Sequence, residues 1–207
     1  MGPSRPAVTT AFPSAADSFA RLVRRIPSDA WSGPGLGEWD LRSLVGHTSR
    51  SLTTVISYLE NPAEREDIAT PQEYYARVNP AALGMDPAEV AERGREAGRD
   101  LGDDPAGAVD ALVSRALARL NAVDDPLITV LGGLGIRLQA YLPTRTFELA
   151  VHSLDITRAL GISFALPPAV LEEALVLAAR IAAGQDGDTV LMALTGRDAL
   201  PVSFSVV

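Results

Sequence analysis

The sequence of 207 residues contains no cysteine and only two histidines. The absence of cysteine excludes disulfides, thiolate metal ligands and a cysteine nucleophile. Any thiol chemistry must therefore use a thiol supplied from outside the chain. Because imidazole is the commonest metal ligand and titrates near neutral pH, His47 and His152 are the first candidates for chemistry.

Lysine is also absent, since all 18 basic residues are arginine, and 26 acidic residues bring the net charge to −8. An acidic chain has little general affinity for nucleic acid or anionic membranes, so we expect neither as a partner. No apolar run approaches the roughly 20 residues of a membrane span, and the first residues lack the apolar core of a signal peptide. These absences predict a cytoplasmic protein.

Helical patterns dominate the chain and predict a mainly α fold in one domain, residues 1–207. Four long amphipathic helices favour a four-helix bundle. Caps and prolines predict helices over 14–26, 41–59, 87–101, 105–120, 143–160 and 168–183, and shorter ones near 72–78 and 189–194. The helix over 87–101 has few apolar positions and is expected to be peripheral.

Three shorter features complete the expected fold. The segment 127–139 predicts a small β-hairpin that turns at Gly132 and Gly133. The alternating apolar residues Val202, Phe204 and Val206 predict a short C-terminal strand. Residues 1–13 contain three prolines and are expected to form a loose N-terminal arm.

His47 lies in the helix that Asp40 is expected to cap. At 100° per residue it falls at the edge of the apolar face, so its imidazole should be at least half buried. Trp39, directly before the cap, is interpreted as a hydrophobic staple that packs on Leu44.

The helix predicted from Pro143 carries a polar stripe between two apolar arcs. The stripe consists of Thr144, Glu148, His152 and Asp155. Such a pattern is typical of a site inside a bundle, because unpaired buried carboxylates cost several kcal/mol. Glu148 and His152 are spaced i, i+4 and therefore point the same way.

Together with His47 from a facing helix, these residues would supply two imidazoles and one carboxylate. Catalytic zinc uses this ligand set and keeps a fourth position open. The facial triad of non-haem iron consists of the same three kinds of ligand, so the ligand set alone does not identify the metal. The alternative is that Glu148 and His152 form an ordinary helical ion pair, and that His47 is a satisfied polar residue at a helix edge.

Two further residues have two interpretations each. Asp155 either orients the His152 imidazole or forms a salt bridge with Arg158 or Arg42. Arg145 either binds a substrate carboxylate through its bidentate guanidinium or forms a structural ion pair.

Three motifs resemble those of the mycothiol-dependent maleylpyruvate isomerase family. The segment 31–47, WSGPGLGEWDLRSLVGH, is similar to the family pattern W-x-x-P-G-L-x-x-W-T-V-R-D-L-V-G-H. The segment 143–161, PTRTFELAVHSLDITRALG, resembles R-T-F-E-L-x-x-H-x-x-D-I, and LMALTGRDALP at 191–201 resembles the closing A-L-T-G-R. The resemblance spans nearly the whole chain.

The resemblance implies a DinB-like four-helix bundle that holds a divalent metal, typically zinc. The matching positions are His47, Glu148 and His152, the same three that the spacing indicates. Family members bind a low-molecular-weight thiol, mycothiol or a relative, as thiolate at the open metal position. The isomerase also has a C-terminal domain that contributes to its active site, and this chain ends near the end of the bundle, so the resemblance implies a thiol donor with an unidentified electrophile.

Three hypotheses follow for the function. The first is a metal-dependent thiol transferase or isomerase that takes a small-molecule thiol and an electrophile. The second is a non-catalytic metal-binding or regulatory bundle, and the third is a hydrolase that activates water at the metal. Packing of exposed helices into a homodimer is compatible with each of them.

Overall fold

The computed structural model describes residues 10–78, 83–84 and 86–207. Its elements are α1 (Phe12–Val23), α2 (Leu41–Tyr58), α3 (Pro71–Arg77), α4 (Pro87–Asp100), α5 (Pro105–Asn121), β1 (Leu127–Val130), β2 (Leu134–Arg137), α6 (Leu138–Leu160), α7 (Pro168–Ala183) and α8 (Gly187–Leu194). This element order confirms a mainly α fold with one small hairpin. None of the described helices combines the length and apolar character that a membrane crossing requires.

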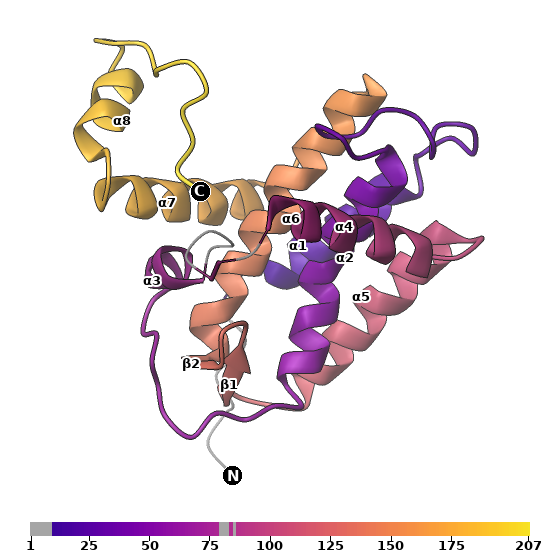
Figure 1. Ribbon diagram of the computed structural model, residues 1–207, viewed down its shortest axis with the longest axis horizontal. Helices are drawn as coiled ribbons and strands as arrows, with labels where there is room; N and C mark the ends of the chain where they lie inside the picture. Colours follow the sequence, from indigo (N-terminus) through magenta and orange to yellow (C-terminus); the bar gives the residue numbers. More distant parts are fainter. Residues whose placement is uncertain (1–9, 79–82, 85) are drawn as a thin grey trace.

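Four helices form the predicted bundle, because α1 and α2 each pack against both α5 and α6 (Figure 1). Their apolar faces meet in a continuous core. Its largest fully buried side chains include Phe12, Phe19, Leu22, Leu41, Leu44, Leu52, Tyr141 and Leu142. The bundle therefore sets α2 and α6, which carry the two histidines, side by side.

The start of α2 follows local sequence rules. Asp40 has an extended backbone, and its carboxylate accepts a hydrogen bond from the Ser43 amide at 2.8 Å. This N-cap satisfies one of the amides that a helix leaves without a partner. The predicted cap is confirmed, and it fixes where His47 lies along the helix.

Two other helix starts differ from their prediction. The first helix begins at Phe12 without a side-chain cap, so Ser14 is not its N-cap. Pro13 fits in the first turn, where a missing N–H leaves no hydrogen bond unmade. Phe12 and Pro13, at the end of the expected arm, thus belong to α1, whereas positions 1–9 of that arm lie outside the described residues.

The long helix α6 begins at Leu138, five residues before Pro143. Its first turn is capped from a distance, because the Gln139 amide donates to Asp125 Oδ1 at 2.8 Å. Proline near the start of a helix is tolerated, and here Pro143 removes the one hydrogen bond that would reach the carbonyl of residue 139. The predicted start of this helix, at Pro143, was therefore wrong by about one and a half turns. It could not be identified locally, because the capping carboxylate of Asp125 is 14 residues away from Gln139 in the sequence.

Helix α4 packs closely against α2 although it has few apolar side chains. The contact uses glycines: a Cβ at Gly46 would lie 2.2 Å from the Gly98 nitrogen, and one at Gly98 would lie 2.9 Å from the Arg42 carbonyl oxygen. The helix lies outside the four-helix bundle, as expected of a peripheral helix, but its close contact with α2 could not be predicted, because backbone-to-backbone contact leaves no trace in the hydrophobic pattern.

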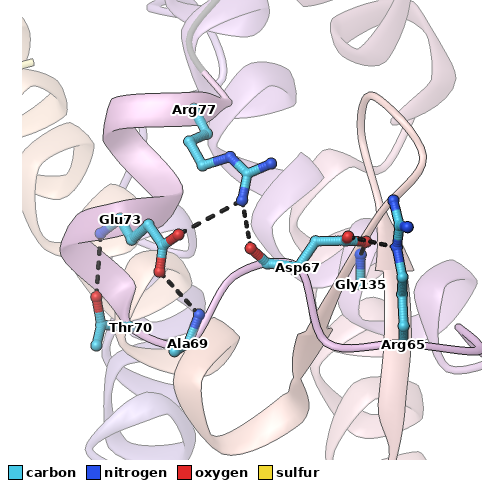
Figure 2. A network of polar contacts seen from close by, with 7 residues as sticks. All are labelled: Arg65, Asp67, Ala69, Thr70, Glu73, Arg77 and Gly135. Atoms are coloured by element: carbon cyan, nitrogen blue, oxygen red, sulfur yellow. Dashed lines mark hydrogen bonds and ion pairs between the residues drawn. The ribbon is translucent and has the colours of Figure 1, made fainter.

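The β-hairpin is tied to the loop that precedes α3. Asp67 accepts a hydrogen bond from the Gly135 amide of β2 at 2.9 Å and pairs with Arg65 at 2.7 Å (Figure 2). The amides of Asp67 and Ile68 donate in turn to the Gly135 carbonyl. The pairing of the two strands, with its turn at Gly132 and Gly133, confirms the predicted hairpin.

The same network continues into α3 and holds that short helix in place. Thr70 caps the helix, because its Oγ1 accepts from the Glu73 amide, and Glu73 Oε2 reaches back to accept from the Ala69 amide. Arg77 links Glu73 to the Asp67 carbonyl (Figure 2). These contacts position Tyr74 and Tyr75, the two tyrosines of α3.

The C-terminal region is more loosely attached than the bundle. Helix α7 packs on α6, whereas α8 contacts α7, stands away from the bundle and has no buried residue (Figure 1). The tail from residue 195 forms no strand, so the predicted C-terminal strand was wrong. The side chain of Val202 is 99% exposed, and Ser203 has a φ of 61°, which interrupts an extended backbone.

Candidate metal centre

His47 projects from the middle of α2 toward α6. Its ring is half buried, and its centroid lies 5.0 Å from that of His152 in an edge-on arrangement. On its other side lies the ring of Trp39, with centroids 4.5 Å apart. Trp39 is itself held by α4, because its indole N–H donates to the Ala91 carbonyl at 2.9 Å.

Glu148 and His152 lie on consecutive turns of α6, as their spacing predicts. Glu148 Oε2 is 3.4 Å from His152 Nε2, and the two side chains are only 23% and 14% exposed. One ligand atom each from His47, Glu148 and His152 lies within 4.8 Å of the other two. The structure thus brings the three predicted residues together at one point.

Asp155 contacts the other nitrogen of His152. Its Oδ2 lies 3.1 Å from His152 Nδ1, whereas its Oδ1 is 3.9 Å from Arg158, whose side chain is 82% exposed. The Arg42 guanidinium instead donates to the Gly98 and Gly102 carbonyls. Of the two interpretations of Asp155, the geometry favours the one in which it orients the imidazole.

Tyr75 of α3 holds the second oxygen of Glu148. Its hydroxyl donates to Glu148 Oε1 at 2.7 Å and lies 3.2 Å from the Thr144 carbonyl. From the sequence, Tyr75 was not identified as a site residue, and Trp39 was interpreted only as a staple. Both reach the site through contacts across the fold, although the low aromatic content of 5% could have drawn attention to them.

The polar stripe of α6 is less enclosed than expected. One of the two predicted apolar arcs consists of Phe147, Ala150, Val151 and Leu154; the first two are buried, but Val151 and Leu154 are 37% and 38% exposed. The carboxyl-terminal half of that arc therefore faces solvent, and it is α2 that covers the stripe.

The two histidines differ in electrostatics. Burial and the nearby His152 lower the pKa of His47 to about 4. Burial also disfavours a charge on His152, but hydrogen bonds with Asp155 and Glu148 outweigh it and raise that pKa to about 9. Burial disfavours the Glu148 carboxylate as well, but His152 and Arg145 stabilise it and lower its pKa to about 2. Without metal at pH 7, only His152 of the two histidines is protonated.

A cavity of about 820 Å³ opens beside His47 and Glu148. Among the described residues that line it, Glu148 is the only one with an acidic side chain. The lining includes all four tyrosines of the chain and three of its arginines: Tyr58, Tyr74, Tyr75, Tyr141, Arg50, Arg93 and Arg145. The cavity wall thus combines aromatic, aliphatic and basic side chains.

Arg145 does not form the structural ion pair that one interpretation expected. Its Nε donates to Thr144 Oγ1 at 3.0 Å, and its guanidinium lies 5.4 Å from the Tyr74 ring centroid and 4.9 Å from that of Tyr141. In the described part of the chain, no carboxylate lies within 4 Å of this guanidinium.

Comparison with known proteins agrees with the geometry. No curated protein and no solved structure matches the chain significantly. A family model, that of the mycothiol maleylpyruvate isomerase N-terminal domain, matches residues 12–157. That range contains His47, Glu148 and His152 and covers most of the chain. The chain therefore belongs to the mycothiol maleylpyruvate isomerase N-terminal domain family.

Proposed function

We propose that the protein is a metal-dependent thiol transferase. In this proposal His47, Glu148 and His152 bind one zinc ion, and a low-molecular-weight thiol related to mycothiol takes the remaining position. The observation that carries the proposal is the convergence of both histidines of the chain and one carboxylate beside a large cavity. The family to which the chain belongs supports a mycothiol-related thiol.

The donor set fits zinc. Two imidazoles and one carboxylate leave one tetrahedral position open, and ligand atoms at ~2.1 Å from the metal would be about 3.4 Å apart. Glu148 Oε2 and His152 Nε2 already have this separation, at 3.4 Å. The widest separation within the trio, up to 4.8 Å, requires only a small movement of a side chain.

A bound divalent ion would lower the pKa of a thiol and keep it as a nucleophilic thiolate at neutral pH. The residues of the chain supply orientation. Asp155 holds the His152 ring so that Nε2 faces Glu148, and Tyr75 holds Glu148 Oε1 so that Oε2 faces His152. His47 is neutral at pH 7, so it can bind a metal without losing a proton.

Metal content and thiol consumption test the proposal together. Purified protein should contain about one equivalent of zinc. After cobalt substitution, addition of mycothiol or N-acetylcysteine should produce a thiolate-to-cobalt absorption band. With epoxides, quinones or maleyl compounds as electrophiles, the free thiol should disappear faster than without protein.

Each alternative gives a different result. Stoichiometric metal without any loss of thiol would indicate the non-catalytic module, and turnover without added thiol would indicate the hydrolase. Either result would overturn the transferase. A protein that binds no zinc, and whose melting temperature zinc leaves unchanged, would overturn the metal site as well.

A further inference from the structure

The two histidines of the candidate metal centre are held in different ways. His152 has a polar neighbour, because its Nδ1 lies 3.1 Å from Asp155 Oδ2. In the described part of the chain, no protein group makes a hydrogen bond with either ring nitrogen of His47. A histidine that binds a metal almost always uses its second nitrogen to contact an outer partner that fixes the ring. The orientation of His47 must therefore come from another kind of contact.

Trp39 contacts His47 through the face of its indole. The two ring centroids are 4.5 Å apart, and the ring planes differ by 35°. This separation is at the short end of the range in which aromatic rings attract one another. A ring face at this distance hinders rotation of the imidazole about its bond to Cβ, so it can fix the ring without a hydrogen bond.

Trp39 is itself fixed by its own loop and by α4. Its amide donates to the Leu36 carbonyl at 3.0 Å, and its carbonyl accepts from the Gly35 amide at 2.9 Å. The indole N–H donates to the Ala91 carbonyl of α4 at 2.9 Å. A Cβ at Gly94 would lie 2.6 Å from Trp39 Cζ2, so the absence of a side chain there leaves room for the indole. The indole is thus held from α4 and presents one face to His47.

The same contact favours a metal-bound imidazole over a free one. An imidazole that donates its lone pair to a divalent ion takes on part of the positive charge of that ion. The face of indole is the best aromatic partner of a cation, and the partial burial of both rings strengthens the attraction. Trp39 should therefore raise the affinity for zinc in addition to fixing the ring.

We propose that Trp39 is a positioning residue of the metal centre: its indole, fixed from α4, orients the His47 ring so that one ring nitrogen faces the two ligands on α6. If Trp39 were only a hydrophobic staple on Leu44, it would stabilise the fold without affecting the metal. The effect on zinc rests on the proposed function, whereas the orientation of the His47 ring does not.

Zinc affinity, measured by competition with a chromophoric chelator, is the first test. Trp39→Leu keeps apolar bulk and removes the ring face, so the affinity should fall about 10- to 100-fold, as on loss of an outer partner. Trp39→Phe keeps a ring and loses the donor to Ala91, so its loss should be smaller. Trp31→Leu is the matched control, because the Trp31 ring lies by Arg42, 5.7 Å from its guanidinium, and it should keep the affinity of the parent.

Two spectra give readouts that a loss of stability would not change. In the cobalt-substituted protein the visible d–d bands report ligand geometry, so Trp39→Leu should shift them and Trp31→Leu should not. The chain has two tryptophans, so Trp31→Phe leaves Trp39 as the only emitter, and its fluorescence should change when zinc binds. The emission of Trp39→Phe, in which Trp31 remains, should not respond.

The outcomes that contradict the proposal are specific. Unchanged zinc affinity and unchanged cobalt bands in Trp39→Leu would overturn it and support the staple. If Trp39→Leu does not fold, the Trp31→Phe variant decides, because Trp39 emission that does not respond to bound zinc would equally overturn it.

Proton NMR of the metal-free protein separates this proposal from the proposed function. The two histidines give the only imidazole C–H signals, and the ring current of an indole stacked at 4.5 Å should move those of His47 upfield. The shift should be smaller in Trp39→Phe and unchanged in Trp31→Leu. A protein that binds no zinc would refute the proposed function, but His47 signals without an upfield shift would overturn the role of Trp39 whether or not zinc binds.

Discussion

The two ends of the cavity differ in how their side chains are held within the protein. At the metal end (His47, Glu148 and His152), each side chain is held by a neighbour outside the trio. At the arginine end (Arg145), the guanidinium donates to Thr144, lies near the rings of Tyr74 and Tyr141, and lines the cavity. The first end is a set of ligand atoms organised before anything binds, whereas the second is a cation beside aromatic rings.

This difference separates the tasks of the two ends. Side chains already held in one rotamer lose little conformational entropy when they bind an ion, so the metal end suits a permanent group. A guanidinium has N–H donors and no acceptor, so the arginine end contributes charge and shape to the cavity but no metal ligand. If the two tasks are separate, a change at one end should leave the other end unaffected.

His152→Ala should cause the largest loss of zinc affinity, and this loss should be confined to the metal end of the cavity. Two remaining ligands rarely hold zinc tightly, so zinc affinity should fall by more than the ~10–100-fold typical of losing an outer partner. Elemental analysis after dialysis in zinc buffer measures this loss. Val151→Ala, at an exposed position beside it on α6, is the matched control and should keep its zinc.

The near-ultraviolet circular dichroism of the same variant shows whether the ends are independent. It should match that of the metal-free parent, because the tyrosines around Arg145 are not altered. A variant that loses both its zinc and this spectrum would contradict the separation of the two ends.

A change of pH should have the next largest effect on zinc affinity. In the metal-free protein His152 has a pKa of about 9 and His47 one of about 4. Only neutral imidazole binds zinc, so between these values binding displaces one proton, from His152. Zinc affinity should therefore rise about tenfold per pH unit, or roughly a hundredfold from pH 6 to pH 8.

Competition with a chromophoric chelator, corrected for its own protonation, measures that slope. Asp155→Asn removes a charge that raises the pKa of His152, so its slope should be shallower. A slope of two protons would show that both histidines are charged in the free protein, and a slope of zero would show that neither is.

Local rules predicted most of the fold. Caps such as Asp40, proline at helix starts and apolar periodicity identified each helix and the hairpin because these signals lie within a few residues of the feature that they specify. The start of α6 and the packing of α4 could not be predicted in this way. The first depends on the distant carboxylate of Asp125, and the second on two glycines that allow backbones to touch.

The candidate site shows the same division. Glu148 and His152 could be paired from their spacing on one helix, and His47 could be added because it is the only other histidine. Their supporting residues could not be predicted. Tyr75 is 73 residues from Glu148, and its hydroxyl reaches the carboxylate because α3 packs against α6 and is tied to the hairpin.

Gly46→Ala should lower the free energy of unfolding of the protein, because the added methyl group would force the backbones of α2 and α4 apart. A Cβ at this position would lie 2.2 Å from the Gly98 nitrogen, so α2 and α4 would have to separate beside His47. We expect a loss of about 2 kcal/mol in the free energy of unfolding, although alanine is the better helix former by ~1 kcal/mol.

Urea denaturation of the metal-free protein measures this change. Gly187→Ala in α8 is the control, because the nearest atom to its Cβ would be 3.6 Å away, and it should be neutral or slightly stabilising. Equal stability of the two variants would show that the crossing of α2 and α4 does not require glycine at position 46.

Tyr75→Phe should have the smallest effect on zinc affinity, yet it tests both ends of the cavity, because Tyr75 contacts Glu148 and also lines the cavity. The variant keeps the ring and removes the donor to Glu148 Oε1, so zinc affinity should fall about tenfold. Burial and the nearby Glu148 raise the pKa of Tyr75 well above its ordinary value. The hydroxyl is therefore a donor throughout the range from pH 6 to pH 8, and the loss should be the same at each pH.

Tyr58→Phe is the matched control, since Tyr58 lines the same cavity and the structure gives its hydroxyl no hydrogen bond to Glu148. Equal zinc affinities of the two variants would show that Glu148 is held without Tyr75. If the two ends are independent, the loss caused by Tyr75→Phe should be the same in the parent and in an Arg145→Lys background, which keeps the charge. A different loss in that background would show that the two ends of the cavity form one coupled site.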